Sequence, residues 1–337
     1  MKKIAIIMPT YNAERTIEES LKSVRKQDYN QKYVEIYVFD GGSTDNTLEI
    51  AKKYGAVIVE NERRLPEFAK IKAFEIVECD YAVYLDSDEI IKSSSSFTRR
   101  VEMLKRNEDL KNIVSTGALC VADELGPSRY ANLVGDPFSN FVYKKYNGYN
   151  RIESMCKTYE YEYCEGEYVY NFKNAKFYPL YDALGSMFDF KFAKELQVES
   201  EKKDTVPTTV FHEMVRKTKQ AGMLEDDYVY HVQGMTRKQY LRKIRWRIIN
   251  NLTQDEGVGF ASREKSSLYL KHKKYLFIPY SMLIIPTLVD AIYKVIKFRD
   301  LYLINHFYYS EATFVMIVWY SLKKMIGNNI SVNSTYK

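Results

Sequence analysis

Two carboxylates, Asp86 and Asp88, directly follow a short apolar run at residues 81–85 and are separated by one residue. Side chains two positions apart in an extended segment point the same way, so both carboxylates can reach one point at the end of a strand. Hard divalent cations prefer oxygen ligands and keep water or phosphate oxygens in their remaining positions. Such a cation would neutralise the charge that develops on a diphosphate leaving group. The alternative is purely local, because acidic residues after a strand often act in loops or as helix N-caps.

Two further polar segments follow apolar runs nearer the amino terminus, one at residues 9–12 and one at residues 40–45. A carboxylate at the tip of a strand, here Asp40, can accept a hydrogen bond from a base N–H or a ribose hydroxyl. The two glycines after it let the backbone approach a ligand closely. Asp45 precedes a helical pattern and suits a helix N-cap. We therefore predict a ligand contact for Asp40 and a capping role for Asp45.

These polar segments are positioned by an alternation of strands and helices over the first ninety or so residues. Strand patterns at 4–8, 34–39, 56–59 and 81–85 alternate with helical patterns at 14–27, 46–54 and 66–78. Such alternation predicts a parallel sheet with helices on both faces, which binds ligands at the carboxyl ends of its strands. Gly55, after the second helical pattern, is expected to be a left-handed C-cap.

The segments MPTYNAE (8–14), FDGGSTDNT (39–47) and YLDSDE (84–89) occur in this order and spacing. Together they resemble the family 2 glycosyltransferases, which have a GT-A fold. The likeness is good over about the first ninety residues and looser over the next hundred and forty or so. It implies an α/β, Rossmann-like, mostly parallel sheet flanked by helices. It also implies a nucleotide-sugar donor, with UDP or GDP as the favoured nucleotides, a Mg²⁺ or Mn²⁺ ion, and inversion at the anomeric carbon.

The same resemblance implies roles for individual residues. Those expected to bind the nucleotide sugar are Thr10, Tyr11, Glu14, Asp40 and Asp86, and those expected to bind the metal are Asp86, Asp88 and His231. The family often has glycines followed by a basic residue before the fourth strand, whereas this chain has Arg63, Arg64 and Lys70 without the glycines. These cations are candidates for diphosphate contacts, and solvated charges on a helix are the alternative. A structural role on a strand is the alternative for His231.

The catalytic base is the least defined role in the sequence. The family commonly has an acidic pair where this chain has Val210 and Phe211. Glu213 and Asp204 lie nearby and are the candidates to take a proton from a sugar hydroxyl. A phosphate monoester is already ionised at neutral pH and needs no base. The missing acidic pair therefore favours a phosphate acceptor, or else one of the two carboxylates replaces it.

The carboxyl-terminal part of the chain differs in charge and hydrophobicity. Residues 1–213 carry 30 basic and 35 acidic side chains, whereas residues 214–337 carry 20 and 9, a net charge of +11. A basic helix is predicted at 236–252, and two apolar segments follow at 275–292 and 312–322. A spanning helix needs about 20 apolar residues, and prolines or charges interrupt both segments. They suit helices that lie in one leaflet, and the alternative is a buried helical subdomain of a soluble protein.

We accordingly predict two domains, a catalytic GT-A domain at 1–232 and a membrane-interface region at 233–337. The four cysteines form no CxxC pair, which argues against a zinc or disulfide framework and favours a reducing compartment. The apolar run at 4–8 is too short for a signal peptide. A 46% hydrophobic, 28% charged composition excludes wholesale disorder. The apolar stripe within the basic helix disfavours nucleic-acid binding.

The leading hypothesis is a glycosyltransferase that is peripheral or monotopic at the cytoplasmic face of the cell membrane. It would use a lipid-linked acceptor, either a polyprenyl phosphate or a lipid-linked glycan, in polysaccharide synthesis or protein glycosylation. One alternative is a soluble glycosyltransferase with a soluble glycan or protein acceptor, whose carboxyl-terminal helices form an oligomer interface. Another is an inert membrane scaffold of the same fold, against which the intact pair of aspartates argues.

Overall fold

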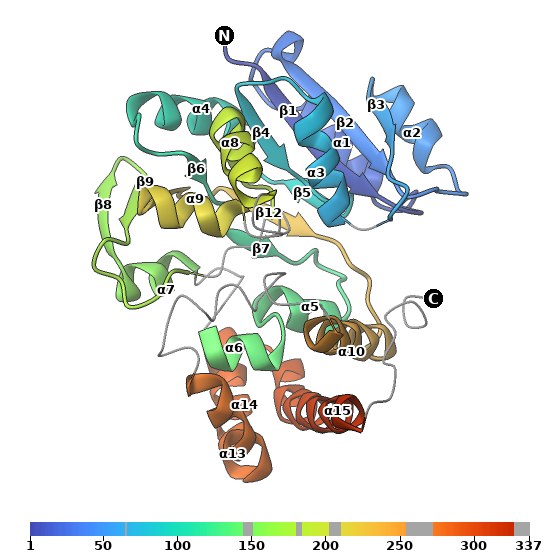
Figure 1. Ribbon diagram of the computed structural model, residues 1–337, viewed down its shortest axis with the longest axis vertical. Coiled ribbons are helices and arrows are strands. Elements are labelled where there is room, and N and C mark those ends of the chain that lie inside the picture. Colours follow the sequence, from blue (N-terminus) through green and yellow to red (C-terminus); the bar gives the residue numbers. More distant parts are fainter. Residues whose placement is uncertain (65, 144–150, 180–183, 202–209, 254–271, 327–337) are drawn as a thin grey trace. The chain divides into compact units, whose positions relative to one another are not determined.

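The computed structural model of this 337-residue chain describes all residues except 65, 144–150, 180–183, 202–209, 254–271 and 327–337. The chain forms two compact units (Figure 1). The first comprises residues 1–121 and 148–232, and the second comprises residues 122–147 and 233–337. One boundary between the two units falls after residue 232. Residues 122–147, which we assigned to the catalytic domain, belong to the helical unit instead.

The first unit begins with four parallel strands in the order β3-β2-β1-β4. Their bounds are β1 (Ile4–Thr10), β2 (Val34–Asp40), β3 (Val57–Glu60) and β4 (Tyr81–Tyr84). All four lie where the hydrophobic pattern predicts a strand. Gly55 has a φ of +68°, the left-handed conformation expected of a helix C-cap before β3.

Beyond β4 the sheet becomes mixed, which corrects the expectation of a mostly parallel sheet. The next strands are β10 (Met187–Asp189), β6 (Asn112–Ile113), β11 (Gln220–Leu224), β9 (Glu167–Asn171) and β8 (Glu160–Cys164). Of these, β10 runs antiparallel to both its neighbours, and β8 and β9 form an antiparallel hairpin. A second sheet has the order β5 (Glu89–Ile91), β12 (Tyr228–His231) and β7 (Gly117–Leu119).

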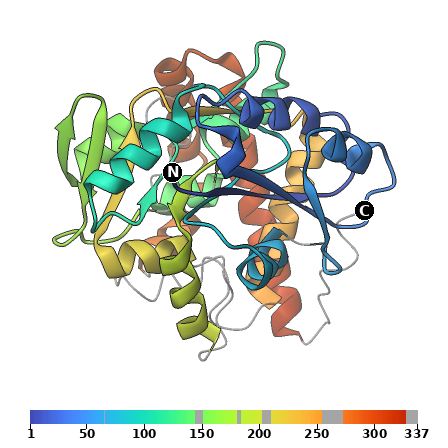
Figure 2. The same ribbon diagram turned by 90° about the horizontal axis from the view of Figure 1, so that it is seen from above.

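Helices cover both faces of the parallel strands (Figure 2). One face packs on α1 (Ile17–Arg25), α2 (Thr47–Lys53) and α4 (Ser96–Arg106), and the other on α3 (Pro66–Ile76) and α8 (Phe190–Glu201). Alternation along β1 explains this arrangement, because Ile4 and Ile6 enter one core whereas Ala5 and Ile7 enter the other. The remaining helices of this unit are η1 (Gln31–Tyr33), α7 (Arg151–Thr158) and α9 (Val210–Thr218).

The second unit is helical in its described residues. Its helices are α5 (Gly126–Leu133), α6 (Pro137–Tyr143), α10 (Arg237–Thr253), η3 (Lys274–Leu276), α13 (Phe277–Met282), α14 (Ile285–Phe298), η4 (Leu301–Asn305) and α15 (His306–Met325). Its core is rich in tyrosine, with Tyr130, Tyr240 and Tyr309 packed against one another.

The predicted apolar segment 275–292 is broken in the structure. Residues 274–282 and α14 meet at a bend of 96°, with Ile284 in the left-handed region at a φ of 60°. Pro286 lies in the first turn of α14, where it lacks an N–H and restricts the residue before it, so the two helices do not continue into each other. Within the described residues, no single helix is long and apolar enough to cross a membrane. The two helices of this bent pair, taken together, have the length and composition of such a helix.

Candidate active site

The carboxyl ends of β1 and β2 lie side by side, with Thr10 paired in register with Asp40. The amide of Gly41 donates to the carbonyl of Thr10 at 2.9 Å. The carboxylate of Asp40 accepts hydrogen bonds from the amides of Gly42 and Ser43, at 2.9 and 2.8 Å, and from the hydroxyl of Ser43. Asp40 therefore shapes its own turn, in addition to any contact with a ligand. The buried hydroxyl of Thr10 has no hydrogen-bond partner among the described residues, so it is free to meet one.

The loops after β1 and β2 are joined by hydrogen bonds that the side chains of each loop accept from the backbone of the other. The side-chain oxygen of Asn12 accepts from the amide of Thr44 at 2.8 Å, and Glu14 accepts from the amide of Asn46 at 3.1 Å. Asp45 accepts from the amide of Glu14 at 3.2 Å, and it also bonds the start of α2, the local role predicted for it. The two loops thus form one connected platform. Glu14, predicted to line a nucleotide pocket, is part of what holds this platform together.

Arg64 lies against the same platform. Its guanidinium carbon is 5.4 Å from the ring centre of Tyr11, a side chain that is 49% exposed. A Cβ on Gly41 would lie only 3.4 Å from the backbone of Arg64, so the turn after Asp40 and the arginine are in close contact. The structure therefore brings together Tyr11, Asp40 and Arg64, three of the residues predicted to bind the donor.

The other two predicted cations face aromatic rings of the same region. The guanidinium of Arg63 lies 4.4 Å from the ring centre of Phe68, and the ammonium of Lys70 lies 4.8 Å from that of Tyr84. Tyr84 is the last residue of β4, two positions before Asp86. Lys70 is therefore placed on α3 near the carboxyl end of the strand that carries the aspartates, whereas Arg63 lies in the turn before α3 and packs on a ring of that helix.

Asp88 and His231 meet in the structure although 143 positions separate them in the sequence. A carboxylate oxygen of Asp88 lies 3.4 Å from Nε2 of His231, and both side chains are partly exposed. The contact follows from strand pairing, because β5 begins directly after Asp88 and pairs antiparallel with β12, which ends at His231. The amide of Val232 also donates to the carbonyl of Asp88 at 2.8 Å.

A third carboxylate, Glu89, lies behind the two aspartates. No pattern in the sequence predicts a role for it. It is 2% exposed and accepts hydrogen bonds from the amides of Asp86 and Gly185, at 3.3 and 2.9 Å. Burial, followed by the negative charges of Asp86 and Asp88, raises the pKa of Glu89 well above its usual range. Burial and the two neighbouring negative charges therefore both favour the protonated form of the Glu89 carboxyl.

Glu89 is itself held by a buried ion pair behind it. Arg100 on α4 donates from Nε to Asp227 at 2.7 Å, with both side chains fully buried, and it also donates to the carbonyl of Gly185. Gly185 has a φ of +53°, and a Cβ there would lie 2.8 Å from Val229. The chain can therefore pass between Glu89 and Arg100 only with glycine at this position.

Of the two candidate bases, Glu213 lies within the described residues. Glu213 lies on α9, where it forms an ion pair with Arg216 one turn further on, at 2.7 Å. Its role as a base stays a prediction. Asp204 lies outside the described residues. Gly222 of β11 is a packing residue, since a Cβ there would meet Leu110 at 2.9 Å.

Comparison with known proteins supports the resemblance noted in the sequence. Residues 5–159 match the family model described as Glycosyl transferase family 2. The match covers 155 of the 337 residues, just under half of the chain. The matched region contains Thr10, Asp40, Asp86 and Asp88, whereas His231 lies beyond the matched residues.

Relatives of this chain are found in bacteria and archaea. The poly(ribitol-phosphate) beta-N-acetylglucosaminyltransferase TarS of Staphylococcus aureus is 34% identical over 101 residues, which are 28% of this chain and 18% of TarS. The putative glycosyltransferase EpsE of Bacillus subtilis is 35% identical over 135 residues, 37% of this chain and 45% of EpsE. A Methanococcus voltae protein, named as a dolichyl N-acetyl-alpha-D-glucosaminyl phosphate glucuronosyltransferase, is 45% identical over 53 residues, or 16% of each chain. The matches thus span less than half of each relative.

Solved structures show the same fold over most of the chain. The mannosyltransferase PcManGT from Pyrobaculum calidifontis, solved with GDP-Man and Mn²⁺, superposes with a TM-score of 0.53 and covers 94% of this chain and 87% of its own, at 16% identity. The structure of S. aureus TarS 1–349 has a TM-score of 0.50 and covers 98% and 93%, at 15% identity. At these identities the likeness concerns the fold, a GT-A-like α/β arrangement with a mixed sheet.

The side chains that the sequence predicts as metal ligands fit a divalent cation in part. Among the described residues, no group of three or more His, Cys, Asp or Glu side chains is placed to hold a metal ion. The carboxylate of Asp88 and the imidazole of His231 nevertheless converge at 3.4 Å beside Asp86. Mg²⁺ and Mn²⁺ sites that handle nucleotides use few protein ligands and complete their shells with phosphate oxygens and water. Asp88 and His231 suit such a cation when a bound nucleotide sugar supplies its diphosphate oxygens as further ligands.

Proposed function

We propose that this chain transfers a sugar from a nucleotide diphosphate donor to a lipid-linked acceptor, with inversion and with the help of Mg²⁺ or Mn²⁺. The observation that carries the catalytic part is the contact of Asp88 with His231 at the end of β4, next to the platform that contains Asp40. A diphosphate between them would face both the cation and the arginine at position 64. PcManGT, which has this fold and was solved with GDP-Man and Mn²⁺, supports such a donor.

The residues of the site have separate tasks in this proposal. Tyr11 and Asp40 bind the nucleoside, and Arg64 and Lys70 bind the diphosphate oxygens. Asp88 and His231 would hold the cation, which when bound neutralises charge on the leaving diphosphate. The raised pKa of Glu89 favours its protonated form, which adds no third negative charge near that diphosphate.

A phosphate monoester as the acceptor fits the absence of an assigned base. Its oxygen is already negative and attacks the anomeric carbon from the side opposite the leaving group, so no proton has to be removed. Glu213, which is occupied by Arg216, is then not required. The Methanococcus voltae relative, by its name, adds a sugar to a sugar phosphate that is linked to dolichol, which supports a lipid-linked acceptor but of the glycan kind rather than the phosphate monoester kind.

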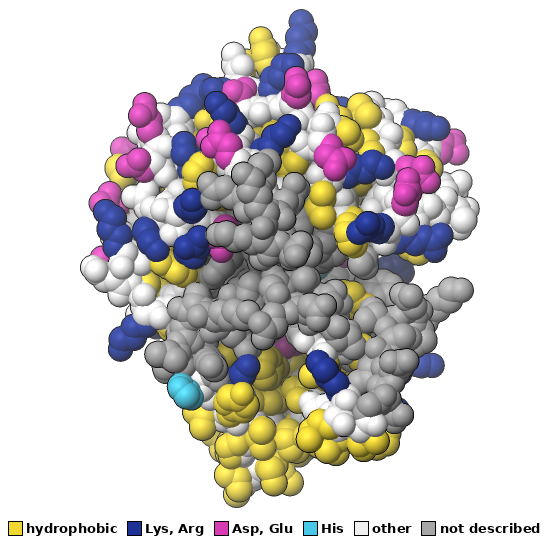
Figure 3. All heavy atoms as spheres, in the orientation of Figure 1, with side chains coloured by type: hydrophobic (Ala, Val, Ile, Leu, Met, Phe, Trp, Pro, Cys, Tyr) yellow, Lys and Arg dark blue, Asp and Glu magenta, His cyan; other side chains and the backbone are white. Residues whose placement is uncertain are grey.

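The lipid part of the proposal rests on the surface of the second unit. Hydrophobic side chains gather over the end of this unit where α13 and α14 lie (Figure 3). The most exposed of them on these two helices are Met282, Leu283, Ile285, Val289 and Ile296, at 60 to 72%. Soluble monomers rarely expose so much contiguous apolar surface, and such a patch marks a membrane or protein contact.

The proposal is tested by measuring release of nucleoside diphosphate from the purified full chain. UDP-glucose, UDP-GlcNAc and GDP-mannose are each supplied with Mn²⁺ or EDTA, and with undecaprenyl phosphate in detergent or detergent alone. We expect one donor to support turnover that requires both Mn²⁺ and the lipid phosphate. Turnover with a soluble glycan but not with the lipid phosphate would instead establish the soluble enzyme. No turnover with any donor, in protein that is folded, would favour the inert scaffold.

A further inference from the structure

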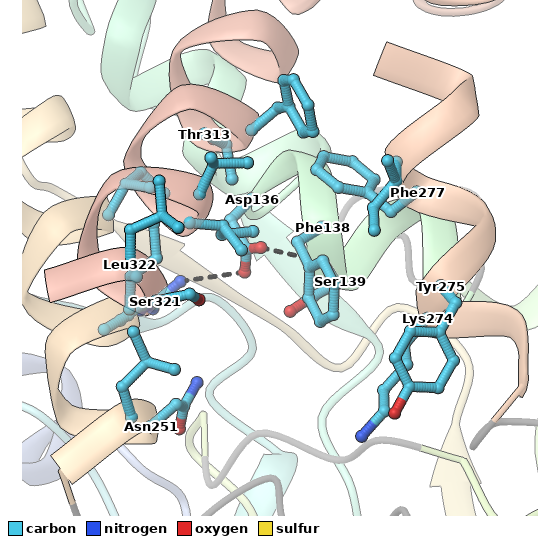
Figure 4. Close-up of a pocket in the computed structure, with 18 residues that line it drawn as sticks. Asp136, Phe138, Ser139, Asn251, Lys274, Tyr275, Phe277, Thr313, Ser321 and Leu322 are labelled. Atoms are coloured by element: carbon cyan, nitrogen blue, oxygen red, sulfur yellow. Dashed lines mark hydrogen bonds and ion pairs between the residues drawn. The ribbon is translucent and has the colours of Figure 1, made fainter. Parts of the chain in front are cut away.

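The second unit contains a cavity of about 580 Å³ that lies entirely within it. Its walls come from four helices, α6, α10, α13 and α15, together with η3 (Figure 4). Pockets that bind small ligands in proteins range from about 300 to 1,000 Å³. The cavity is therefore of ligand size, and none of the residues that line it belongs to the site described above.

The walls of this cavity are predominantly apolar. α10 contributes Ile244 and Ile248, α13 contributes Phe277, and α15 contributes Phe314 and Ile317. Water gains few hydrogen bonds in such a space, so an apolar chain is the occupant that these walls favour. Removing apolar surface from water contributes about 25 cal/mol per Å².

The cavity is continuous with the exposed apolar surface of the same unit. Tyr275, Ile278 and Leu322 line it, and their side chains are 59%, 44% and 48% exposed. They lie on η3, α13 and α15, and α13 also carries Met282 of the exposed surface. A hydrocarbon chain can therefore enter the cavity from a membrane without passing through water.

Cationic groups also line the cavity. Arg247 donates to Asp136 at 3.2 Å, and the amide of Ser139 holds the same carboxylate at 2.8 Å. The side chain of Arg247 is 38% exposed, which leaves room for a second anionic partner. In Figure 4 the side chains of Lys274 and Asn251 lie toward one end and that of Thr313 lies toward the other. An occupant with an apolar chain and an anionic head matches both features.

We propose that this cavity binds the hydrocarbon chain of the lipid phosphate acceptor, with Arg247 and Lys274 contacting its phosphate. The inference rests on the proposed function, because it identifies the occupant with that acceptor. The second unit then selects the acceptor by its chain and charge, whereas the first unit selects the donor.

Two tryptophans make this site measurable without labels. Trp246 and Trp319 are the only tryptophans of the chain, both lie in the second unit, and each adjoins a lining residue, Arg247 or Val318. Farnesyl phosphate is added below its micellar concentration, in the absence of vesicles, and tryptophan emission is recorded. We expect a saturable change in emission. Farnesol, which lacks the phosphate, should bind about tenfold more weakly, because it loses a charge-assisted contact.

Two pairs of variants separate the chain from the charge. Ser321→Phe fills the cavity and should weaken binding of farnesyl phosphate about tenfold or more, since the chain loses its space. Val315→Phe, on the same helix but outside the cavity, is its control and should bind normally. Lys274→Gln should reduce the preference for farnesyl phosphate over farnesol. Lys297→Gln, which also removes a lysine lying over a tyrosine ring but lines no part of the cavity, should preserve it.

Equal binding by Ser321→Phe and the parent chain would overturn the proposal. So would equal affinity of the parent chain for farnesol and farnesyl phosphate. Transfer to undecaprenyl phosphate is measured on the same variants. Undiminished transfer by Ser321→Phe would remove the cavity assignment and leave the proposed function standing. The predicted binding pattern without transfer to any lipid phosphate would instead keep the lipid site and remove the proposed function.

Discussion

At the scale of single residues, the site is a set of side chains held by the backbone around them. Asp40 is bound by its own turn, and Glu89 by two amides, one of which belongs to Gly185. Asp88 and His231 by contrast are partly exposed and have side chains that face each other. Groups held in place before a ligand arrives lose little freedom when it binds, which is how a transferase positions a diphosphate for departure.

Asp88→Ala is expected to lower turnover by about 100- to 1,000-fold, the range measured when one charge-stabilising group is removed from an active site. EDTA should lower turnover of the parent chain similarly, and excess Mn²⁺ should restore the parent far better than the variant. Asp80→Asn is the control, since this residue pairs with Lys2 before β4 and should keep normal turnover. Turnover of the parent chain, Asp88→Ala and Asp80→Asn is measured as release of nucleoside diphosphate. An Asp88→Ala protein with undiminished turnover would remove Asp88 from the metal site.

The sequence could reveal only part of this site. Asp40, Asp86 and Asp88 stand out because each follows a strand pattern within a short motif. Glu89 and Gly185 interact across 96 positions, and Arg100 and Asp227 across 127. No local periodicity links residues at such separations, so only the folded chain identifies them. Breaking a buried pair such as Arg100–Asp227 typically costs about 3–5 kcal/mol, because the remaining charge is left without a partner.

At the scale of elements, the difference between the two halves of the sheet has a physical cause. The first four strands are joined by helices directly along the chain, and hydrophobic periodicity detects that arrangement. β10 and β6 have only three and two residues and pair with distant segments, so hydrophobic periodicity does not predict them. The same reasoning explains residues 122–147. Their two short helices, α5 and α6, pack in the second unit through contacts with residues far away in the sequence, which local patterns do not predict.

Helices of the second unit are joined by a buried polar network. His306 of α15 bonds Tyr130 of α5 at 2.6 Å, Tyr280 of α13 at 3.0 Å and Asp290 of α14 at 3.2 Å. Lys294 also donates to Asp290. Burial would raise the pKa of Asp290, but the hydrogen bond from His306 and the charge of Lys294 hold it below its usual range. Burial lowers the pKa of His306 to about 4, so the imidazole is neutral in the folded chain at pH 7.

This network predicts a loss of stability on mild acidification. Below pH 6.5 the unfolded chain protonates His306, whereas the folded chain does so only near pH 4, so the free energy of unfolding falls across that window. The loss should approach about 3 kcal/mol at pH 4. His306→Gln should flatten the slope, and His272→Gln, at an exposed position of the same unit, should not. Denaturant unfolding followed by tryptophan emission reports on this unit. A slope equal in His306→Gln and the parent would contradict the assignment.

At the scale of the whole molecule, charge and apolar surface divide between the two units. The second unit carries 20 basic and 9 acidic side chains, a net charge of +11, whereas the first carries 30 and 35, a net charge of −5. The exposed aliphatic side chains of α13 and α14 also belong to the second unit. Anionic lipid attracts basic groups near its surface by about 1 kcal/mol each. A unit with both properties suits a membrane surface better than a second copy of itself, which would carry the same charge.

The membrane contact is tested by flotation of the full chain with vesicles. Binding should be strong on vesicles that contain anionic lipid, and both neutral lipid and raised salt should weaken it, because screening removes the electrostatic part. Ile285 is 70% exposed at the start of α14. Burying an isoleucine is worth about 1.5–3 kcal/mol, so Ile285→Glu should bind about 10- to 100-fold more weakly. Ile76→Glu, at a 44% exposed position of α3, should bind normally.

A chain that stays in the buffer with every vesicle composition would contradict the membrane contact. Light scattering then decides what covers the apolar surface. If the parent chain is a dimer and Ile285→Glu is a monomer, the surface is an oligomer interface, and the soluble enzyme becomes the better account of this chain. The repulsion between two units of net charge +11 would weaken such a dimer at low salt and strengthen it at high salt, the opposite of the trend expected for anionic vesicles. The sign of the salt dependence therefore distinguishes the two occupants of the same surface.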